Sequence, residues 1–100
     1  MNINFTPEMT RRAAKLLGAL SNPHRLQILC VLHEGEMSVG GLQAHVGISQ
    51  SNLSQQLARL REEDLVRTRR DAQKIFYALA NEDVTRIIAV LHDLYCKPAG

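Results

Sequence analysis

The chain has 100 residues, which is enough for one domain with a limited hydrophobic core. Its 45% hydrophobic and 22% charged residues are typical of a soluble globular protein, and a net charge of +2 is too small to indicate a nucleic-acid partner by itself. No hydrophobic run approaches the roughly 18 residues that span a membrane, and the first residues lack the charged and hydrophobic regions of a signal peptide. We therefore expect a single domain over residues 1–100, in the cytoplasm and away from membranes, where thiols are usually reduced.

The first third of the chain predicts two helices. Thr6 and Pro7 form a helix start, with a capping side chain followed by proline at the first helical position. Ser21 breaks this helix, and Asn22 caps a second one that extends to about His33. The second helix is hydrophobic on nearly all sides, so we expect it at the centre of the core.

A helix-turn-helix is predicted next, from helices over about residues 39–46 and 50–63. Gly47 permits the tight turn between them, Ser38 caps the first helix and Ser49 the second, and leucines at 53, 57 and 60 form the buried face of the second helix. No acidic residue occurs between Met37 and Arg61, so the opposite face can contact bases and phosphates. The expected DNA contacts on this helix are Ser49, Gln50, Ser51, Asn52, Ser54, Gln55, Gln56 and Arg59. A polar, solvated helix face is the alternative reading.

Two strands are predicted after the helix-turn-helix, over residues 65–71 and 74–79, with a hairpin tip at residues 70–73. A last helix, capped by Asn81, follows over about residues 82–95. The resulting order α-α-α-α-β-β-α is mainly helical with a small β-hairpin, and it predicts a winged helix-turn-helix. We expect the basic residues of the wing to contact the DNA backbone or groove, although a charge cluster is often only a solvated face: Arg67, Arg69, Arg70 and Lys74.

The first and last helices carry more hydrophobic surface than the centre needs, which indicates a homodimer. The candidate interface residues are Phe5, Leu16, Leu20, Ile87, Leu91, Leu94 and Tyr95; they could instead complete the monomer core. Two recognition helices related by a two-fold axis would meet half-sites about 34 Å apart, so we expect a palindromic operator.

Four segments spread over residues 20–79 match one known family: LSNPHRLQIL at 20–29, SVGGL at 38–42, SQSNLSQQLARLREEDLV at 49–66 and FYAL at 76–79. Through them the chain resembles the ArsR/SmtB family of small bacterial dimeric repressors. The resemblance implies a repressor that binds double-stranded operator DNA and leaves it when an inducer binds or modifies the protein.

The metal-sensing branches of this family place a Cys-x-Cys-type motif at the start of the third helix, or acid and histidine ligands on the last helix. Residues 36–41 contain no cysteine here, and Asp83, His92 and Asp93 lack the paired spacing of those branches. We therefore expect no metal and no other cofactor. A metal-responsive repressor with ligands not evident in the sequence remains the alternative.

The two cysteines resemble those of the dithiol branch of the family. The flanks ILCVL at residues 28–32 and LHDLYC at residues 91–96 match that branch, as does the 66-residue separation of Cys30 and Cys96. The resemblance implies that reactive sulfur species or an oxidant bridges the pair, by a disulfide or a polysulfide, and that DNA affinity then falls. Taken singly, Cys30 could be a small buried hydrophobic residue and Cys96 an incidental surface thiol.

An enzyme is not expected. The sequence has no Cys-x-x-Cys, no nucleotide-binding loop and no paired acid and base residues. A winged helix used only for protein contacts is a further alternative, but such a wing would not need three arginines within four positions.

Overall fold

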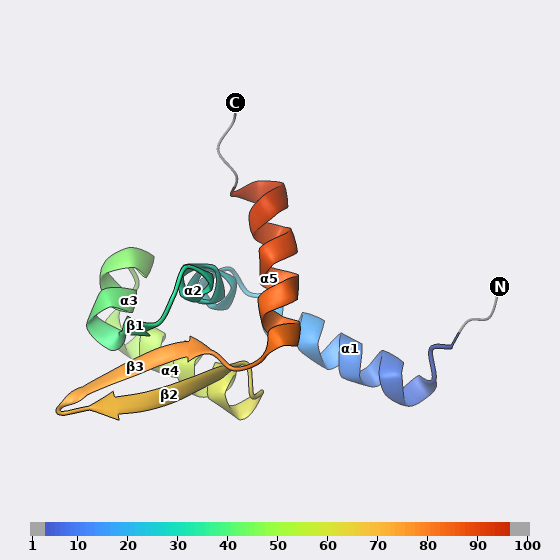
Figure 1. Ribbon diagram of the computed structural model, residues 1–100, viewed down its shortest axis with the longest axis horizontal. Coiled ribbons are helices and arrows are strands. Elements are labelled where there is room, and N and C mark those ends of the chain that lie inside the picture. Colours follow the sequence, from blue (N-terminus) through green and yellow to red (C-terminus); the bar gives the residue numbers. More distant parts are fainter. Residues whose placement is uncertain (1–3, 97–100) are drawn as a thin grey trace.

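The fold is a winged helix-turn-helix, as the sequence predicts (Figure 1). It is seen in a computed structural model that describes residues 4–96. The elements of this part of the chain are α1 (Pro7–Leu20), α2 (Pro23–His33), β1 (Met37–Ser38), α3 (Val39–Val46), α4 (Gln50–Glu62), β2 (Val66–Asp71), β3 (Lys74–Leu79) and α5 (Glu82–Tyr95).

Each helix begins at the capping residue that the sequence predicts. The Thr6 side chain accepts a hydrogen bond from the Met9 backbone N–H, and Asn22 accepts from His24 and Arg25 at 2.9 and 3.1 Å. Ser38, Ser49 and Asn81 cap the remaining three helices in the same way. These bonds satisfy N–H groups that the first turn of a helix leaves without partners.

The predicted hairpin of β2 and β3 forms, and a short strand β1 adds to it, which gives an antiparallel sheet in the order β1-β3-β2. β1 pairs Met37 with Tyr77 and Ser38 with Phe76. A strand of two residues has no detectable alternation, so the sequence could not reveal it. The tip is also tighter than predicted: Asp71 pairs with Lys74, which leaves two residues for the turn.

The core is centred on α2, as its hydrophobic character predicts. Ile28 and Leu29 of α2 are fully buried, together with Leu42 of α3, Leu53 of α4 and Ile88 of α5. One cluster of buried side chains therefore joins the helix-turn-helix to the last helix.

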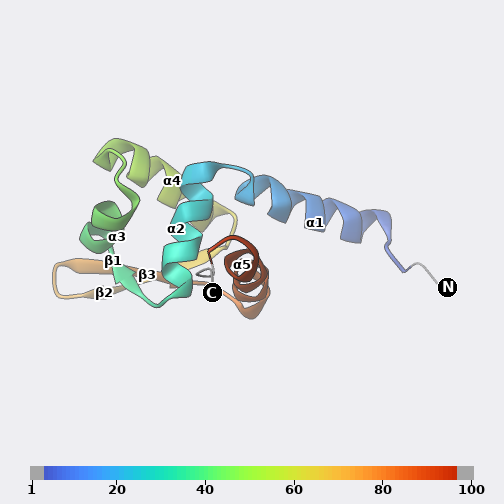
Figure 2. The ribbon, with the colours of Figure 1, turned by 90° about the horizontal axis from the view of Figure 1, so that it is seen from above.

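α1 extends away from the compact part of the protein (Figures 1 and 2). Its C-terminal residues Ala19 and Leu20 are buried, whereas Met9 and Leu17 are 50% and 60% exposed. Most of α1 thus has little packing within one chain. None of the described helices is long and hydrophobic enough to cross a membrane.

Candidate DNA interface and thiol pair

The helix-turn-helix is held by a glycine and by two side-chain hydrogen bonds. Gly47 ends α3 in the left-handed conformation, with φ of 72°. The Gln43 amide donates to the Ile48 carbonyl at 3.2 Å, and Ser49 accepts from the Asn52 N–H at 3.1 Å. The turn therefore fixes the direction in which α4 leaves α3.

The outer face of α4 contains most of the predicted base-reading residues. Leu53, Leu57 and Leu60 are buried, so the residues between them point outward. Six of the eight predicted contacts on this helix are exposed: Ser49, Gln50, Ser51, Ser54, Gln55 and Arg59. Arg59 also lies 3.3 Å from Glu63 in an ion pair one turn along the helix.

Asn52 and Gln56 are half-buried and hydrogen-bond to each other, whereas the sequence predicts both on the exposed DNA-contacting face of α4. The Gln56 amide nitrogen donates to the Asn52 side-chain oxygen at 2.9 Å. The Gln56 oxygen accepts from Arg25 of α2 at 3.2 Å. These two amides therefore support the position of α4 in the fold.

Arg25 is a structural residue that sequence reasoning missed. Its Nε donates to the Ala19 carbonyl at 2.7 Å, and its Nη2 lies 3.5 Å from the Gly18 carbonyl. Together with its bond to Gln56, this arginine connects the end of α1 to the recognition helix. Its position in the first turn of α2 gave no sequence signal, since a single arginine there is usually solvated.

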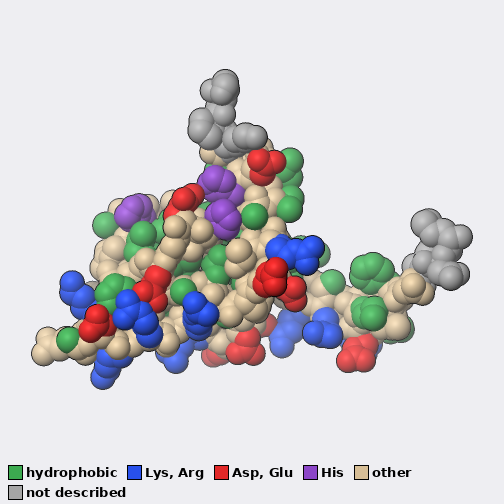
Figure 3. Space-filling model, viewed as in Figure 1, with side chains coloured by type: hydrophobic (Ala, Val, Ile, Leu, Met, Phe, Trp, Pro, Cys, Tyr) green, Lys and Arg blue, Asp and Glu red, His purple; other side chains and the backbone are tan. Residues whose placement is uncertain are grey.

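The wing displays all four predicted basic residues on its surface: Arg67, Arg69, Arg70 and Lys74. Figure 3 shows Lys and Arg side chains gathered around this end of the molecule. Such a surface can contact phosphates without reading sequence.

Arg69 is already engaged by an acid, which the sequence did not reveal. Its Nη2 lies 2.7 Å from Glu36 Oε1, and its guanidinium stacks 4.5 Å above the Phe76 ring centre. The hydrogen bond from Arg69 lowers the pKa of Glu36 and raises the pKa of Arg69 itself. Glu36 thus remains ionised beside the wing.

The two cysteines come from α2 and from the end of α5. Cys30 is half-buried, Cys96 is exposed, and both are free. Burial raises the pKa of the Cys30 thiol, and negative charge on Cys96 and a hydrogen bond with Cys96 raise this pKa further. The two thiols therefore come from helices that pack against each other, although 66 positions separate them in the sequence.

The predicted dimer residues divide into three groups. Phe5, Leu94 and Tyr95 are exposed by 71%, 66% and 81%. Leu16, Ile87 and Leu91 are half-buried and line a groove between α1 and α5. Leu20 is only 6% exposed, so it completes the monomer core, which was the alternative role.

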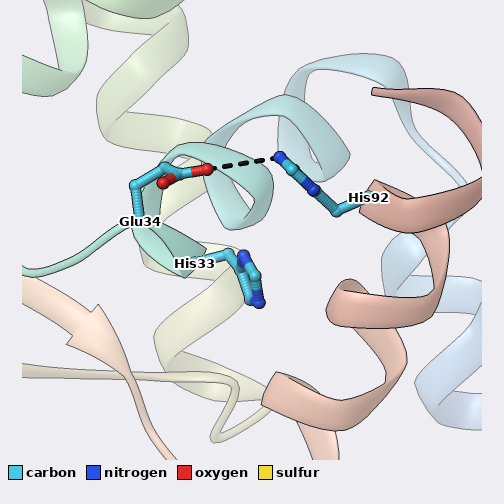
Figure 4. Close-up of side chains that lie close together, drawn as sticks. All are labelled: His33, Glu34 and His92. Carbon is cyan, nitrogen blue, oxygen red and sulfur yellow. Dashed lines mark ion pairs between the residues drawn. The ribbon is translucent and has the colours of Figure 1, made fainter. Parts of the chain in front are cut away.

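The structure also brings together His33, Glu34 and His92 (Figure 4). The first two end α2 and the third lies on α5. Their side chains are of the kinds that bind metals, and sequence reasoning missed the group because His92 lies far along the chain from the adjacent His33 and Glu34.

Comparison with known proteins agrees with this architecture. Residues 22–68 match the family described as "Bacterial regulatory protein, arsR family". The transcriptional activator HlyU of Vibrio cholerae is 46% identical over 97 residues, covering 97% of this chain and 90% of that protein. The solved structure of reduced HlyU from Vibrio cholerae has a TM-score of 0.87, with 48% identity over 90% of this chain and 95% of that chain.

Two further relatives bear on repression and assembly. The biofilm growth-associated repressor of Agrobacterium fabrum is 46% identical over 95 residues, covering 92% of this chain and 81% of that protein. A homodimeric winged helix-turn-helix DNA-binding domain from Mycobacterium bovis has a TM-score of 0.77, with 28% identity over 100% of this chain and 93% of that chain. These relatives are regulators rather than enzymes. The chain belongs to the ArsR family of bacterial transcriptional regulators, which bind DNA through a winged helix-turn-helix.

Proposed function

We propose that the protein is a homodimeric repressor of the cytoplasm that leaves a palindromic operator when Cys30 and Cys96 become bridged. The inducer would be a reactive sulfur species or an oxidant. The observation that carries this proposal is that two free thiols, Cys30 on α2 and Cys96 at the end of α5, come from two helices that pack against each other.

The DNA-binding surface would combine α4 and the wing. Exposed amides and hydroxyls of α4, such as Gln50, Ser51, Ser54 and Gln55, supply donors and acceptors for base edges in the major groove. The basic side chains of the wing supply positive charge for phosphates: Arg67, Arg69, Arg70 and Lys74. Contacts to bases would then determine which DNA sequence is bound, and contacts to phosphates would fix the position of the protein along the duplex.

Dimerisation would bury the hydrophobic surface that one chain leaves open. Leu17 of α1 and Val90, Leu94 and Tyr95 of α5 are all more than half exposed. Large exposed hydrophobic patches mark interaction sites in soluble proteins. A two-fold pairing of α1 and α5 would cover these patches and present two copies of α4.

The bridging chemistry would begin at Cys96. It is the more exposed thiol, and burial disfavours the thiolate of Cys30. The Cys96 thiolate attacks a sulfur atom of a polysulfide, forms a persulfide and expels the shorter polysulfide. Cys30 then attacks the Cys96 sulfur, which forms the Cys–Cys bond and releases hydrosulfide; the two thiols lose two protons and two electrons, and the sulfur donor gains the electrons. If the Cys96 chain carries more than one added sulfur, Cys30 can instead attack an added sulfur; the sulfur beyond it leaves as hydrosulfide or a shorter polysulfide, and a polysulfide bridge remains.

A bridge could affect DNA binding through α2. Cys30 and Arg25 lie on this helix, and Arg25 hydrogen-bonds Gln56 of the recognition helix. A covalent link from α2 to α5 would change how α2 sits between the dimer helices and α4. A coupling of about 1–3 kcal/mol, typical of allosteric proteins, would weaken operator binding about 5–150-fold.

Cysteine substitutions test this mechanism. We expect Cys30→Ser and Cys96→Ser to bind operator when reduced and to stay bound after polysulfide treatment, because neither can form the intramolecular bridge. Release of either variant at the dose that releases the unsubstituted protein would contradict the mechanism.

A further inference from the structure

A cluster of three potential metal ligands lies between the end of α2 and α5. His33 is the last residue of α2, Glu34 caps that helix, and His92 lies on α5. One ligand atom from each residue lies within 4.8 Å of the other two. Figure 4 shows His92 reaching from α5 toward Glu34, with His33 beside them.

The distances within the cluster suit a small divalent ion. His92 Nε2 lies 3.2 Å from Glu34 Oε1. Ligands about 2.0–2.1 Å from a tetrahedral zinc ion are about 3.3 Å from one another. This histidine and carboxylate are therefore already at ligand spacing, and rotation of the His33 side chain would complete a three-residue site.

His33 has an unsatisfied polar atom. Its Nδ1 is buried and lacks a hydrogen-bond partner among the described residues. A buried polar atom without a partner costs free energy. The His33 and His92 rings also lie only 5.4 Å apart between centres, so two imidazoles share one small space. A bound cation would favour this arrangement, since neutral imidazole nitrogens are good ligands for borderline metals.

We propose that His33, Glu34 and His92 bind a divalent transition-metal ion of the zinc class. Two imidazoles and one carboxylate are a ligand set that zinc accepts while keeping a fourth position for water. The side chains of Glu34 and His92 are 67% and 33% exposed, so an ion can reach them from solvent.

This site is distinct from the thiol pair and from the metal motifs expected of the family. It combines the C-terminal end of α2 with α5, whereas those motifs lie at the start of the third helix or within the last helix. It also lies on the same two helices as the cysteines: His33 follows Cys30 by three residues, and His92 precedes Cys96 by four. A metal ion would therefore link α2 to α5 independently of any sulfur bridge.

Zinc and cobalt titrations of the full, reduced protein test the proposal. We expect one Zn²⁺ per chain in competition with a chromophoric zinc indicator. Glu34→Gln and His92→Gln should each weaken binding by more than about tenfold, since the loss of even an outer-shell partner costs 10–100-fold. Co²⁺ should give visible bands of a nitrogen and oxygen site, without thiolate-to-cobalt charge transfer.

Two control variants separate this site from other sites. His45→Gln removes an exposed histidine on α3, and the double variant Cys30→Ser, Cys96→Ser removes both thiols. Both should bind Zn²⁺ as the unsubstituted protein does. Any of three results would overturn the proposal. These are failure of the unsubstituted protein to bind Zn²⁺, binding of Zn²⁺ by the Glu34 and His92 variants as tightly as by the unsubstituted protein, and loss of Zn²⁺ binding in the double cysteine variant. Circular dichroism checks that each variant is folded. If a histidine variant does not fold, the Glu34→Gln variant decides the test, because Glu34 is exposed.

Discussion

Arg69 of the wing is held by both carboxylate oxygens of Glu36, with its Nε 2.8 Å from each. A wing arginine that contacts phosphate would exchange this carboxylate for DNA. Glu36→Gln should therefore raise affinity for all DNA, because it removes a competing negative charge from the wing. Glu82→Gln, at the start of α5, makes the same charge change away from the wing and should have a smaller effect. Anisotropy titrations with random-sequence DNA measure both; equal effects would count against the wing contact.

Arg69→Ala gives the complementary result. We expect weaker binding to all sequences and a reduction of about 1 in the slope of log affinity against log salt, because one phosphate contact is lost. Titrations at several salt concentrations provide the slope. An unchanged slope would mean that Arg69 makes only its contacts within the chain, with Glu36, Asp71 and Phe76.

Gln55 is expected to read a base, because it is exposed on the outer face of α4. Gln55→Ala should weaken operator binding by about 1–3 kcal/mol, the range for loss of a bidentate base contact, with little change on random DNA. Gln27→Ala, an exposed glutamine on α2, should change neither affinity. Equal losses on both kinds of DNA would assign Gln55 to the backbone instead.

Two glycines should respond to alanine in opposite directions. Gly47 has φ of 72°, where a side chain costs about 1–2 kcal/mol, so Gly47→Ala should lower the free energy of unfolding. Gly40 lies within α3, and an added Cβ would meet no atom within 4 Å. Gly40→Ala should therefore raise the free energy of unfolding by about 0.5–1 kcal/mol. Urea denaturation measures both changes. A stable Gly47→Ala protein would show that the turn does not require the left-handed conformation.

The pKa of Cys30 predicts a pH-dependent order of alkylation. Since burial and Cys96 raise this pKa, the Cys30 thiolate is scarce near neutral pH and increases as the pH rises. Iodoacetamide should therefore modify Cys96 first, and peptide mass analysis should find Cys30 modified mainly at alkaline pH. In Cys96→Ala, the Cys30 profile should move to lower pH; an identical profile would mean that the thiols do not interact.

The raised pKa of Cys30 also makes the free energy of unfolding depend on pH. This free energy should decline as the pH rises through the Cys30 titration, because the thiol loses its proton at a lower pH in the unfolded chain than in the folded one.

The helices were predictable because their signals are local. Caps at Thr6, Asn22, Ser38, Ser49 and Asn81 are read within a few residues of the chain, and all five helices begin there. β1 was missed because two residues carry no periodicity and its pairing with β3 is long-range.

The site was only partly predictable for the same reason. Exposure of Gln55 or Arg70 follows from helix and strand periodicity. The bonds of Arg25 to Gln56 and of Arg69 to Glu36 span 31 and 33 positions, so no local pattern indicates them. His33, Glu34 and His92 likewise become a group only when α2 packs against α5.

The most direct test of the thiol switch is operator binding by fluorescence anisotropy before and after polysulfide, with intact-mass analysis of the same samples. We predict that binding weakens about 5–150-fold while the mass shows Cys30 and Cys96 bridged within one chain. Unchanged binding by protein whose two cysteines are bridged would contradict the account.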